Sequence, residues 1–177
     1  MKARRVAGAP ERIEWAVQQL AVEPADHLLE VGCGGGYAVA LVCGLLARGT
    51  ITAIDRSALQ VARARARNSA CVAAGQARIE RAALEDLVVG CRRFDKIFAV
   101  NVNAFWTTPA GSLACIRPLL RPRGDVYLVY QPPTAARLRA VKAALSALLE
   151  SHGFAVRRVE TQAFRVGHGL CIIGRPK

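Results

Sequence analysis

Residues 28–36 read LLEVGCGGG, and this short stretch decides the fold class. An apolar run of strand length stops at Gly32, and an apolar segment of helix length, residues 37–47, follows the last glycine. Glycines between a strand and a helix permit positive φ angles and let a ligand approach the backbone. The first turn of the helix adds N–H groups that have no intrahelical partner. The stretch therefore predicts a strand–loop–helix unit with a ligand at its loop.

An acidic residue stands where such a ligand would need it. A second strand, expected at residues 50–54, ends beside Asp55, nineteen residues after Gly36. A carboxylate at this place can accept two hydrogen bonds from a ribose diol. A glycine loop followed by such an acid is typical of nucleoside-binding sites.

The spacing of the glycines narrows the choice of nucleoside. A dinucleotide-binding loop reads GxGxxG, and its last glycine would fall at Tyr37, whereas this chain reads GxGxG at Gly32, Gly34 and Gly36. Glu30, two residues before the loop, would repel a pyrophosphate and suits a ligand with an ammonium or sulfonium charge. A nicotinamide-dependent oxidoreductase is therefore disfavoured.

Strand-length and helix-length segments alternate along the rest of the chain. Further strands are expected at 27–31, 77–81, 94–102, 125–130, 154–160 and 170–174, and helices at 11–21, between 57 and 75, at 109–120 and at 134–151. Ser57 can cap the second of these helices. The alternation predicts an α/β fold, a three-layer αβα sandwich with a mostly parallel sheet and a final antiparallel hairpin. Ligands of such sheets bind beyond the carboxyl ends of the strands.

Length and charge set the remaining limits. The 177 residues are expected to form one domain, residues 1–177, in which residues 1–24 form an N-terminal helix or lid. The formal charge of +12 keeps nucleic acid open as a partner. Arg63, Arg65 and Arg67, spaced by two, would scatter around a helix and form no stripe. The simpler explanation of the positive charge is a general bias of the composition toward arginine, which outnumbers lysine by 21 to 4.

The cysteines and the N-terminus indicate an intracellular chain. None of the six cysteines lies within a CxxC pair, so neither a zinc site nor a disulfide framework is expected. No apolar run follows the basic N-terminal residues, and no uncharged stretch reaches the length of a membrane span. We expect a cytoplasmic protein with no metal and no membrane contact.

At this point a family resemblance is clear. Residues 28–36 resemble motif I of the class I S-adenosylmethionine-dependent methyltransferases, and ITAIDRS, residues 51–57, resembles their ribose-binding second motif. FDKIFAVNVNAFW, residues 94–106, is similar to the family's fourth strand and the loop after it. LLRPRGDVYLVY, residues 119–130, is similar to the segment written LLxPGG, with Arg123 in place of its first glycine. The resemblance extends from Leu20 to the final hairpin.

The resemblance implies a seven-stranded sheet of order 3-2-1-4-5-7-6 with strand 7 antiparallel. It also implies methyl transfer from S-adenosylmethionine, which leaves S-adenosylhomocysteine. In this chain the cofactor would be held by Glu30, Gly32, Cys33, Gly34, Gly36, Asp55, Arg56, Ala83, Leu84 and Asn101. Asp55 would bind the ribose, and Arg56 and Ser57 would border the adenine. Ala83 stands where the family often has an acid, so Glu85, Asp86 or backbone N–H groups at Ala83 and Leu84 would serve the adenine.

Methyl transfer is an in-line displacement in which the protein mainly positions donor and acceptor. Asn101, at the end of the fourth strand, is the candidate catalytic residue through positioning. Asn103, Phe105, Trp106 and Tyr130 are candidates for the acceptor pocket, although the aromatic residues, Phe105 above all, can instead cap the core. His168 is a possible base if the hairpin folds over the site, and Tyr130 and Gln131 are comparable outside candidates. NVNA, residues 101–104, differs from the NPPY-type motif of amino-methylating DNA and glutamine enzymes, which disfavours those substrates.

The acceptor class stays open between two interpretations. The chain is close to the bare core of the family and carries no obvious extra domain, which favours a small-molecule acceptor. Its positive charge leaves two alternatives open. One is an RNA methyltransferase, and the other is a non-catalytic module of the same fold that binds nucleosides or RNA. The sequence predicts no oligomeric state.

Overall fold

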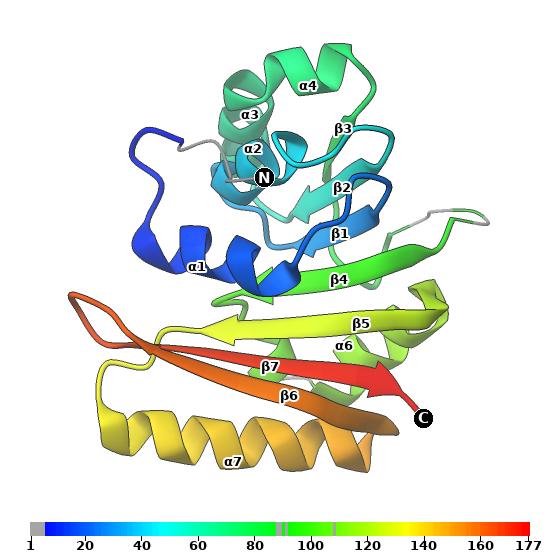
Figure 1. The fold of residues 1–177 in the computed structure, drawn as a ribbon. Helices are drawn as coiled ribbons and strands as arrows, with labels where there is room; N and C mark the ends of the chain where they lie inside the picture. Colours follow the sequence, from blue (N-terminus) through cyan, green and yellow to red (C-terminus); the bar gives the residue numbers. More distant parts are fainter. Residues whose placement is uncertain (1–5, 88–89, 91, 108) are drawn as a thin grey trace.

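A computed structural model of the chain describes residues 6–87, 90, 92–107 and 109–177, apart from the side chains of residues 106, 107 and 109. Its strands form one seven-stranded sheet in the order β3-β2-β1-β4-β5-β7-β6 (Figure 1). They are β1 (His27–Val31), β2 (Thr50–Asp55), β3 (Ala77–Arg81), β4 (Phe94–Val100), β5 (Leu120–Tyr130), β6 (Phe154–Ala163) and β7 (His168–Pro176). The first five pair in parallel, and β7 runs antiparallel to both β5 and β6. The predicted α/β class and strand order are confirmed.

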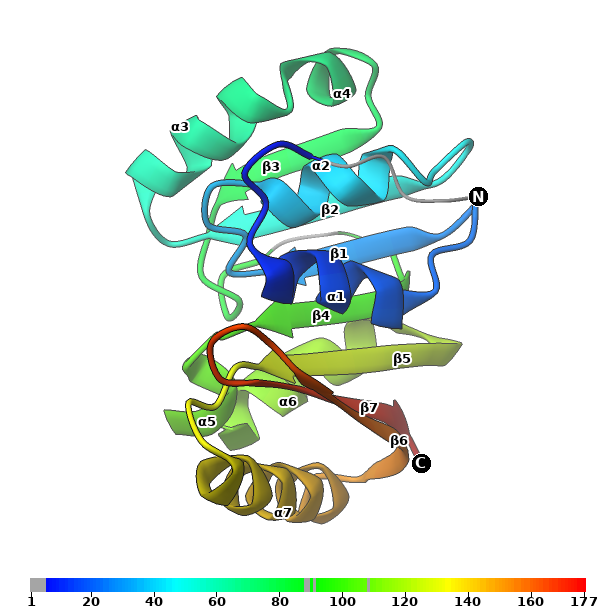
Figure 2. The ribbon, with the colours of Figure 1, turned by 60° about the vertical axis from the view of Figure 1, so that its left-hand side comes forward.

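Helices cover the sheet on two sides and bury two separate apolar clusters (Figures 1 and 2). One layer contains α1 (Glu11–Leu20), α2 (Tyr37–Cys43), α3 (Ala58–Arg67) and α4 (Ser69–Ala73). The other contains α5 (Ala104–Thr107), α6 (Pro109–Ile116), the 3-10 turn η1 (Arg117–Leu119) and α7 (Ala135–Ser151). The predicted αβα sandwich is confirmed. No helix within the described ranges is both long and apolar enough to cross a membrane.

The second helical layer is incomplete beside β2 and β3. The described residues between β3 and β4, which are 82–87, 90, 92 and 93, form no helix. One face of β3 and of the first half of β2 therefore lacks a helical cover, although the expected alternation implied helices on both faces. This gap creates a groove whose residues are considered below.

Two elements differ from expectation in ways that affect the site. The helix expected between 57 and 75 is broken at Asn68, whose φ of −110° and ψ of 23° separate α3 from α4. The strand expected to reach residue 102 ends at Val100, because Asn101 adopts a φ of 55°. The Asn101 N–H still donates to the Val129 carbonyl at 2.8 Å, so the turn begins while β4 and β5 are still paired.

Other differences are shifts of element ends. The helix expected at 37–47 ends at Cys43, before Gly44, and the helix expected at 109–120 ends at Ile116. Pro118, which has no N–H to donate, lies in the following turn. The fifth strand begins at Leu120 instead of 125. The sixth strand extends to Ala163 instead of 160, and the seventh runs from His168 to Pro176 instead of 170–174.

Candidate active site

The glycine loop, residues 32–36, is fixed to the end of β2. The N–H groups of Gly32 and Cys33 both donate to the Ile54 carbonyl, at 2.8 and 2.9 Å. Gly32 has a φ of 75°, and a Cβ built there would lie 2.6 Å from Cγ2 of Val102. Both the backbone angle and the close approach of the next loop therefore require glycine at this position.

The other end of the loop rests on Asn68, a residue that the sequence analysis did not select. The Asn68 side-chain amide is buried and donates to the carbonyls of Gly36, at 3.0 Å, and Ala64, at 2.8 Å. A Cβ at Gly36, where φ is 74°, would lie 2.6 Å from the same amide nitrogen. A single asparagine inside an alanine-rich helix was the only available signal for this contact.

Asp55 connects the loop to the start of α3. Its Oδ2 accepts from the Gly34 N–H at 2.9 Å, and its Oδ1 accepts from the Ser57 N–H at 2.9 Å. These bonds orient the carboxylate and leave each oxygen with further acceptor capacity. A Cβ at Gly34 would meet no atom within 4 Å, so the loop is open to a ligand on this side.

Glu30 is a buried carboxyl group with an incomplete set of hydrogen bonds among the described residues. Its side chain is 2% exposed, and Oε2 has no hydrogen-bond partner among the described residues. Burial, together with the nearby Asp55 carboxylate, raises the pKa of Glu30 to about 8. A buried carboxyl without a cation is costly unless it is protonated, so this position favours a positively charged ligand.

A cavity of about 230 Å³, here called the loop cavity, opens beside Asp55. Its lining comes from the ends of β1, β2 and β3 and from the loop after β4: Val31, Gly32, Ile54, Asp55, Arg56, Ala82, Ala83, Leu84, Glu85, Val102 and Ala104. Five of the ten predicted cofactor residues, Gly32, Asp55, Arg56, Ala83 and Leu84, meet in this cavity. Glu30, Cys33, Gly34 and Gly36 lie on the adjoining strand and loop, whereas Asn101 lines a different cavity.

The far wall of the loop cavity carries the groups expected near an adenine. Arg56 forms an exposed ion pair with Glu85, and such exposed pairs contribute little to stability. Glu85 is therefore already engaged, and Asp86 does not line the cavity. The N–H groups of Ala83 and Leu84 donate to no acceptor among the described residues.

A second cavity, of about 190 Å³ and here called the tyrosine cavity, lies at the ends of β4 and β5. It is lined by Asn101, Asn103, Tyr130, Gln131, Pro132, Pro133, Arg137 and Val141. The Asn101 Oδ1 accepts from the Gln131 N–H at 2.9 Å, and the Tyr130 hydroxyl donates to the Val102 carbonyl at 2.8 Å. Burial raises the pKa of Tyr130 to about 12, so this hydroxyl is a poor base at neutral pH.

Two predicted acceptor residues do not join this cavity. Phe105 is fully buried and packs in the apolar cluster between the sheet and α6, so it supports the core. Trp106 belongs to α5, but its side chain lies outside the described residues. His168 lies at the start of β7, where its N–H donates to the Pro132 carbonyl, and its side chain lines neither cavity.

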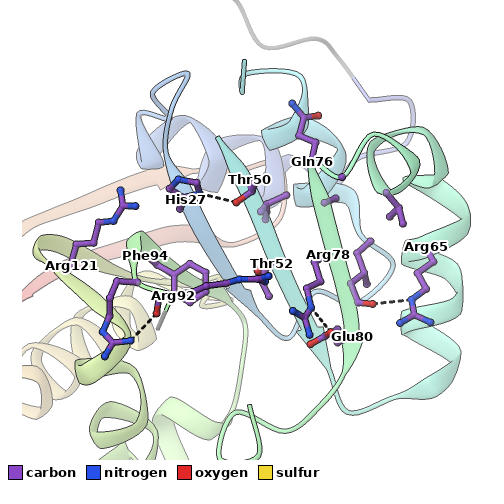
Figure 3. Close-up of a pocket in the computed structure, with 16 residues that line it drawn as sticks. His27, Thr50, Thr52, Arg65, Gln76, Arg78, Glu80, Arg92, Phe94 and Arg121 are labelled. Atoms are coloured by element: carbon purple, nitrogen blue, oxygen red, sulfur yellow. Dashed lines mark hydrogen bonds and ion pairs between the residues drawn. The ribbon is translucent and has the colours of Figure 1, made fainter. Parts of the chain in front are cut away.

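A larger hollow, of about 950 Å³, lies on the uncovered face of β1 to β3 and shares no lining residue with the other two cavities (Figure 3). Within the described part of the chain, no three histidine, cysteine, aspartate or glutamate side chains are grouped as a metal site would require. The predicted site residues that line a cavity lie in the two smaller ones.

Comparison with known proteins identifies the family of this chain. The sequence model of a family described as a methyltransferase domain matches residues 29–126, more than half of the chain. The O-methyltransferase cnsE of Penicillium expansum is 32% identical over 104 residues, which cover 59% of this chain. The matched segment spans 37% of the length of that relative.

Solved structures share the fold at low sequence identity. Precorrin-6y C5,15-methyltransferase from Geobacter metallireducens GS-15 is 14% identical with a TM-score of 0.74, covering 100% of this chain and 94% of that one. Magnesium protoporphyrin IX methyltransferase from Synechocystis PCC 6803, solved with bound S-adenosylhomocysteine, is 15% identical with a TM-score of 0.70, covering 99% and 90%. The family match includes both the glycine loop and Asp55. This chain therefore belongs to the methyltransferase-domain family.

Proposed function

We propose that the chain binds S-adenosylmethionine at the glycine loop and transfers its methyl group to a small-molecule acceptor. The observation that carries this proposal is Glu30, a fully buried carboxyl whose Oε2 has no partner among the described residues. Such a group beside an open loop fits a cationic ligand and does not fit a pyrophosphate. The NAD alternative is disfavoured by the same observation.

The surrounding residues fit the rest of this cofactor. Asp55, already oriented by two N–H groups, would accept hydrogen bonds from the ribose hydroxyls. The loop cavity, at about 230 Å³, is smaller than the ~300 Å³ at the lower end for drug-sized ligands, which suits a nucleoside alone. The N–H groups of Ala83 and Leu84 would serve the adenine, and the methionine part would follow the open side of Gly34 toward Glu30. When bound, the cofactor supplies the activated methyl carbon.

The chain's own contribution is orientation. Asn101 holds a φ of 55°, a left-handed angle that asparagine adopts more readily than most residues, and its side chain fixes the start of the segment after β5. It is therefore proposed as a positioning residue between the two cavities. In favourable cases, orientation supplies about 7–11 kcal/mol of a barrier, so an acceptor that is already nucleophilic needs no base.

The tyrosine cavity is the proposed acceptor site. Its volume of about 190 Å³ and its mixture of amide, phenol and proline surfaces suit a small polar molecule. The neighbours named for precorrin and magnesium protoporphyrin support an acceptor that is not a macromolecule, although those acceptors are larger than this cavity.

The N-terminal segment 1–24 is proposed as the cover of the site, with residues 1–5 outside the described part. α1 is attached to the tip of the β6–β7 hairpin: Trp15 packs edge-on against Phe164, and Glu11 accepts from the Arg165 N–H. The same tip reaches the tyrosine cavity, where Gln131 donates to the Val166 carbonyl at 2.7 Å. Helix and hairpin together would limit access to the acceptor.

Thermal unfolding with saturating ligands tests the cofactor assignment. S-adenosylmethionine or S-adenosylhomocysteine at 100 times its Kd should stabilise the fold by about 2.7 kcal/mol, a rise of roughly 5–10 °C. Asp55→Asn should remove this rise, and Asp86→Asn, the same change at an exposed acid outside the cavity, should keep it. A rise with NAD alone, or an unchanged rise in folded Asp55→Asn, would overturn the site.

The acceptor class is tested by the release of S-adenosylhomocysteine. The protein is incubated with S-adenosylmethionine and either a pool of small phenols, amines and carboxylic acids or total RNA. Product released only with the small molecules supports the proposal. Release that depends on RNA would contradict it.

A further inference from the structure

The two faces of the β1–β3 half of the sheet differ in polarity. On the face covered by α2 and α3, the strands present buried apolar residues such as Ile51 and Ile79. On the uncovered face, alternate positions are polar: His27 on β1, Thr50 and Thr52 on β2, and Arg78 and Glu80 on β3. A polar, helix-free face indicates contact with water or with a polar partner.

Arginines gather around this face. The hollow of about 950 Å³, here called the arginine groove, is lined by five of them: Arg65, Arg78, Arg92, Arg93 and Arg121. Arg78, Arg92, Arg93 and Arg121 come from β3, the segment before β4 and β5, so residues far apart in the sequence line this face. Arg65 reaches the edge of β3 from α3, on the covered side (Figure 3). This convergence is a property of the fold and is absent from the sequence pattern.

Most of this positive charge is not neutralised locally. Arg78 pairs with Glu80, and Arg121 pairs with Asp95 at 2.8 Å to both carboxylate oxygens. Within the described ranges, the other three arginines form no ion pair with a carboxylate. The groove is therefore a positive surface on a chain whose formal charge is already +12, and it will attract polyanions.

The rest of the lining indicates which polyanion fits. Val72, 38% exposed, is the single exposed large hydrophobic residue among the described lining, and Phe94 is only 3% exposed. A protein partner would need apolar anchors, and a stacked base would need an exposed aromatic ring. His27 and Thr50 are half-buried and hydrogen-bonded to each other at 2.8 Å through Nδ1 and Oγ1. The second ring nitrogen of His27 and the remaining lone pair of Thr50 suit a ribose 2′-hydroxyl.

We propose that the arginine groove binds the sugar–phosphate backbone of RNA without reading its bases. Guanidinium groups bind phosphate oxygens in a bidentate fashion, and their spread over four elements suits successive phosphates along a strand better than one small anion. The groove shares no lining residue with the loop cavity, so this binding does not depend on the proposed methyl transfer.

The test compares two double variants with the same loss of charge. Arg92→Gln with Arg93→Gln changes the groove, and Arg139→Gln with Arg157→Gln removes two exposed arginines from α7 and β6. Affinity for a fluorescein-labelled 20-nucleotide RNA is measured by anisotropy from 50 to 200 mM salt. Each lost phosphate contact lowers the slope of log K against log salt by about 0.7. Between 50 and 200 mM salt, the loss of affinity should therefore be about sevenfold smaller in the groove variant than in wild type.

The outcomes are distinct. The proposal is supported if the groove variant alone shows the lower slope, if RNAs of different sequence bind alike, and if DNA of the same sequence binds less tightly. An equal decrease of the slope in the two double variants would overturn the assignment of RNA binding to the groove, because it would reflect the total charge alone. DNA or polyglutamate that binds as tightly as RNA would overturn the assignment to RNA. An unchanged stabilisation of the groove variant by S-adenosylhomocysteine shows that the protein is folded and separates this result from the cofactor assignment.

Discussion

The loop cavity and the arginine groove are built in opposite ways, and the smaller of the two is the one that we propose for the cofactor. The loop cavity, about 230 Å³, lies beside a glycine loop with positive φ angles, and the buried Glu30 is on the adjoining strand. The arginine groove, about 950 Å³, is lined by exposed arginine side chains over a floor of buried strand residues. Strain and buried charge, which fold stability must offset, mark a functional site better than volume does.

The difference has an energetic consequence. Changes at the loop cavity should alter the free energy of unfolding, pH dependence and cofactor binding together. Changes at the arginine groove should alter the salt dependence of RNA binding and little else. The predictions below test this contrast, beginning with the largest expected effect.

Glu30→Gln should change the pH dependence of stability most. The pKa of Glu30 is raised from 4.5 to about 8 in the folded protein, so between these values the folded state holds a proton that the unfolded state has lost. Stability from this group therefore falls as pH rises through that window, by a total on the order of 4 kcal/mol. The variant lacks this loss, so urea unfolding at pH 4.5 and pH 8 should show its stability relative to wild type increasing with pH. If the stability of the variant and that of wild type changed with pH in parallel, the raised pKa of Glu30 would be contradicted.

Gly36→Ala should cost about 3 kcal/mol, because a Cβ there would meet both the Asn68 amide and the backbone of Ala64 at a φ of 74°. Gly34→Ala is the matched control within the loop. Its Cβ meets no atom within 4 Å, so only the backbone term of about 1 kcal/mol remains. If urea unfolding showed the same loss of stability in both variants, the close packing of Gly36 against Asn68 and Ala64 would be contradicted.

Asn68→Ala should cost about 1–2 kcal/mol, because two side-chain hydrogen bonds to the Gly36 and Ala64 carbonyls are lost. The loop then loses its support, so the Kd for S-adenosylhomocysteine should rise as well. Ser69→Ala, the adjacent exposed position, is the control and should leave both values unchanged. A stability loss with an unchanged Kd would limit Asn68 to a role in the helix break.

The groove variant Arg92→Gln with Arg93→Gln should have the smallest effect on folding, within about 0.5 kcal/mol of wild type. Both side chains are exposed and form no ion pair among the described residues. Urea unfolding and the Kd for S-adenosylhomocysteine provide the check. A large loss of either would show that the two regions are coupled, contrary to the comparison.

Local pattern was enough to predict the glycine loop, Ser57 as a helix cap and the parallel core of the sheet. These features depend on neighbours in sequence, and the structure confirms the fold and the cap. The full strand order came from the family resemblance. What could not be predicted depends on distant contacts: Asn68 under the loop, and the arginines that come together where the described residues between β3 and β4 form no helix. Which predicted residues contact cofactor and acceptor stays a prediction.

The central claim is that Glu30 receives the positive charge of S-adenosylmethionine. Isothermal titration calorimetry at pH 7 in two buffers of different ionisation enthalpy measures the protons released on binding. Because the pKa of Glu30 is about 8 before binding and a cation lowers it, wild type should release close to one proton per cofactor, and Glu30→Gln none. Binding to wild type with no proton release would contradict the account.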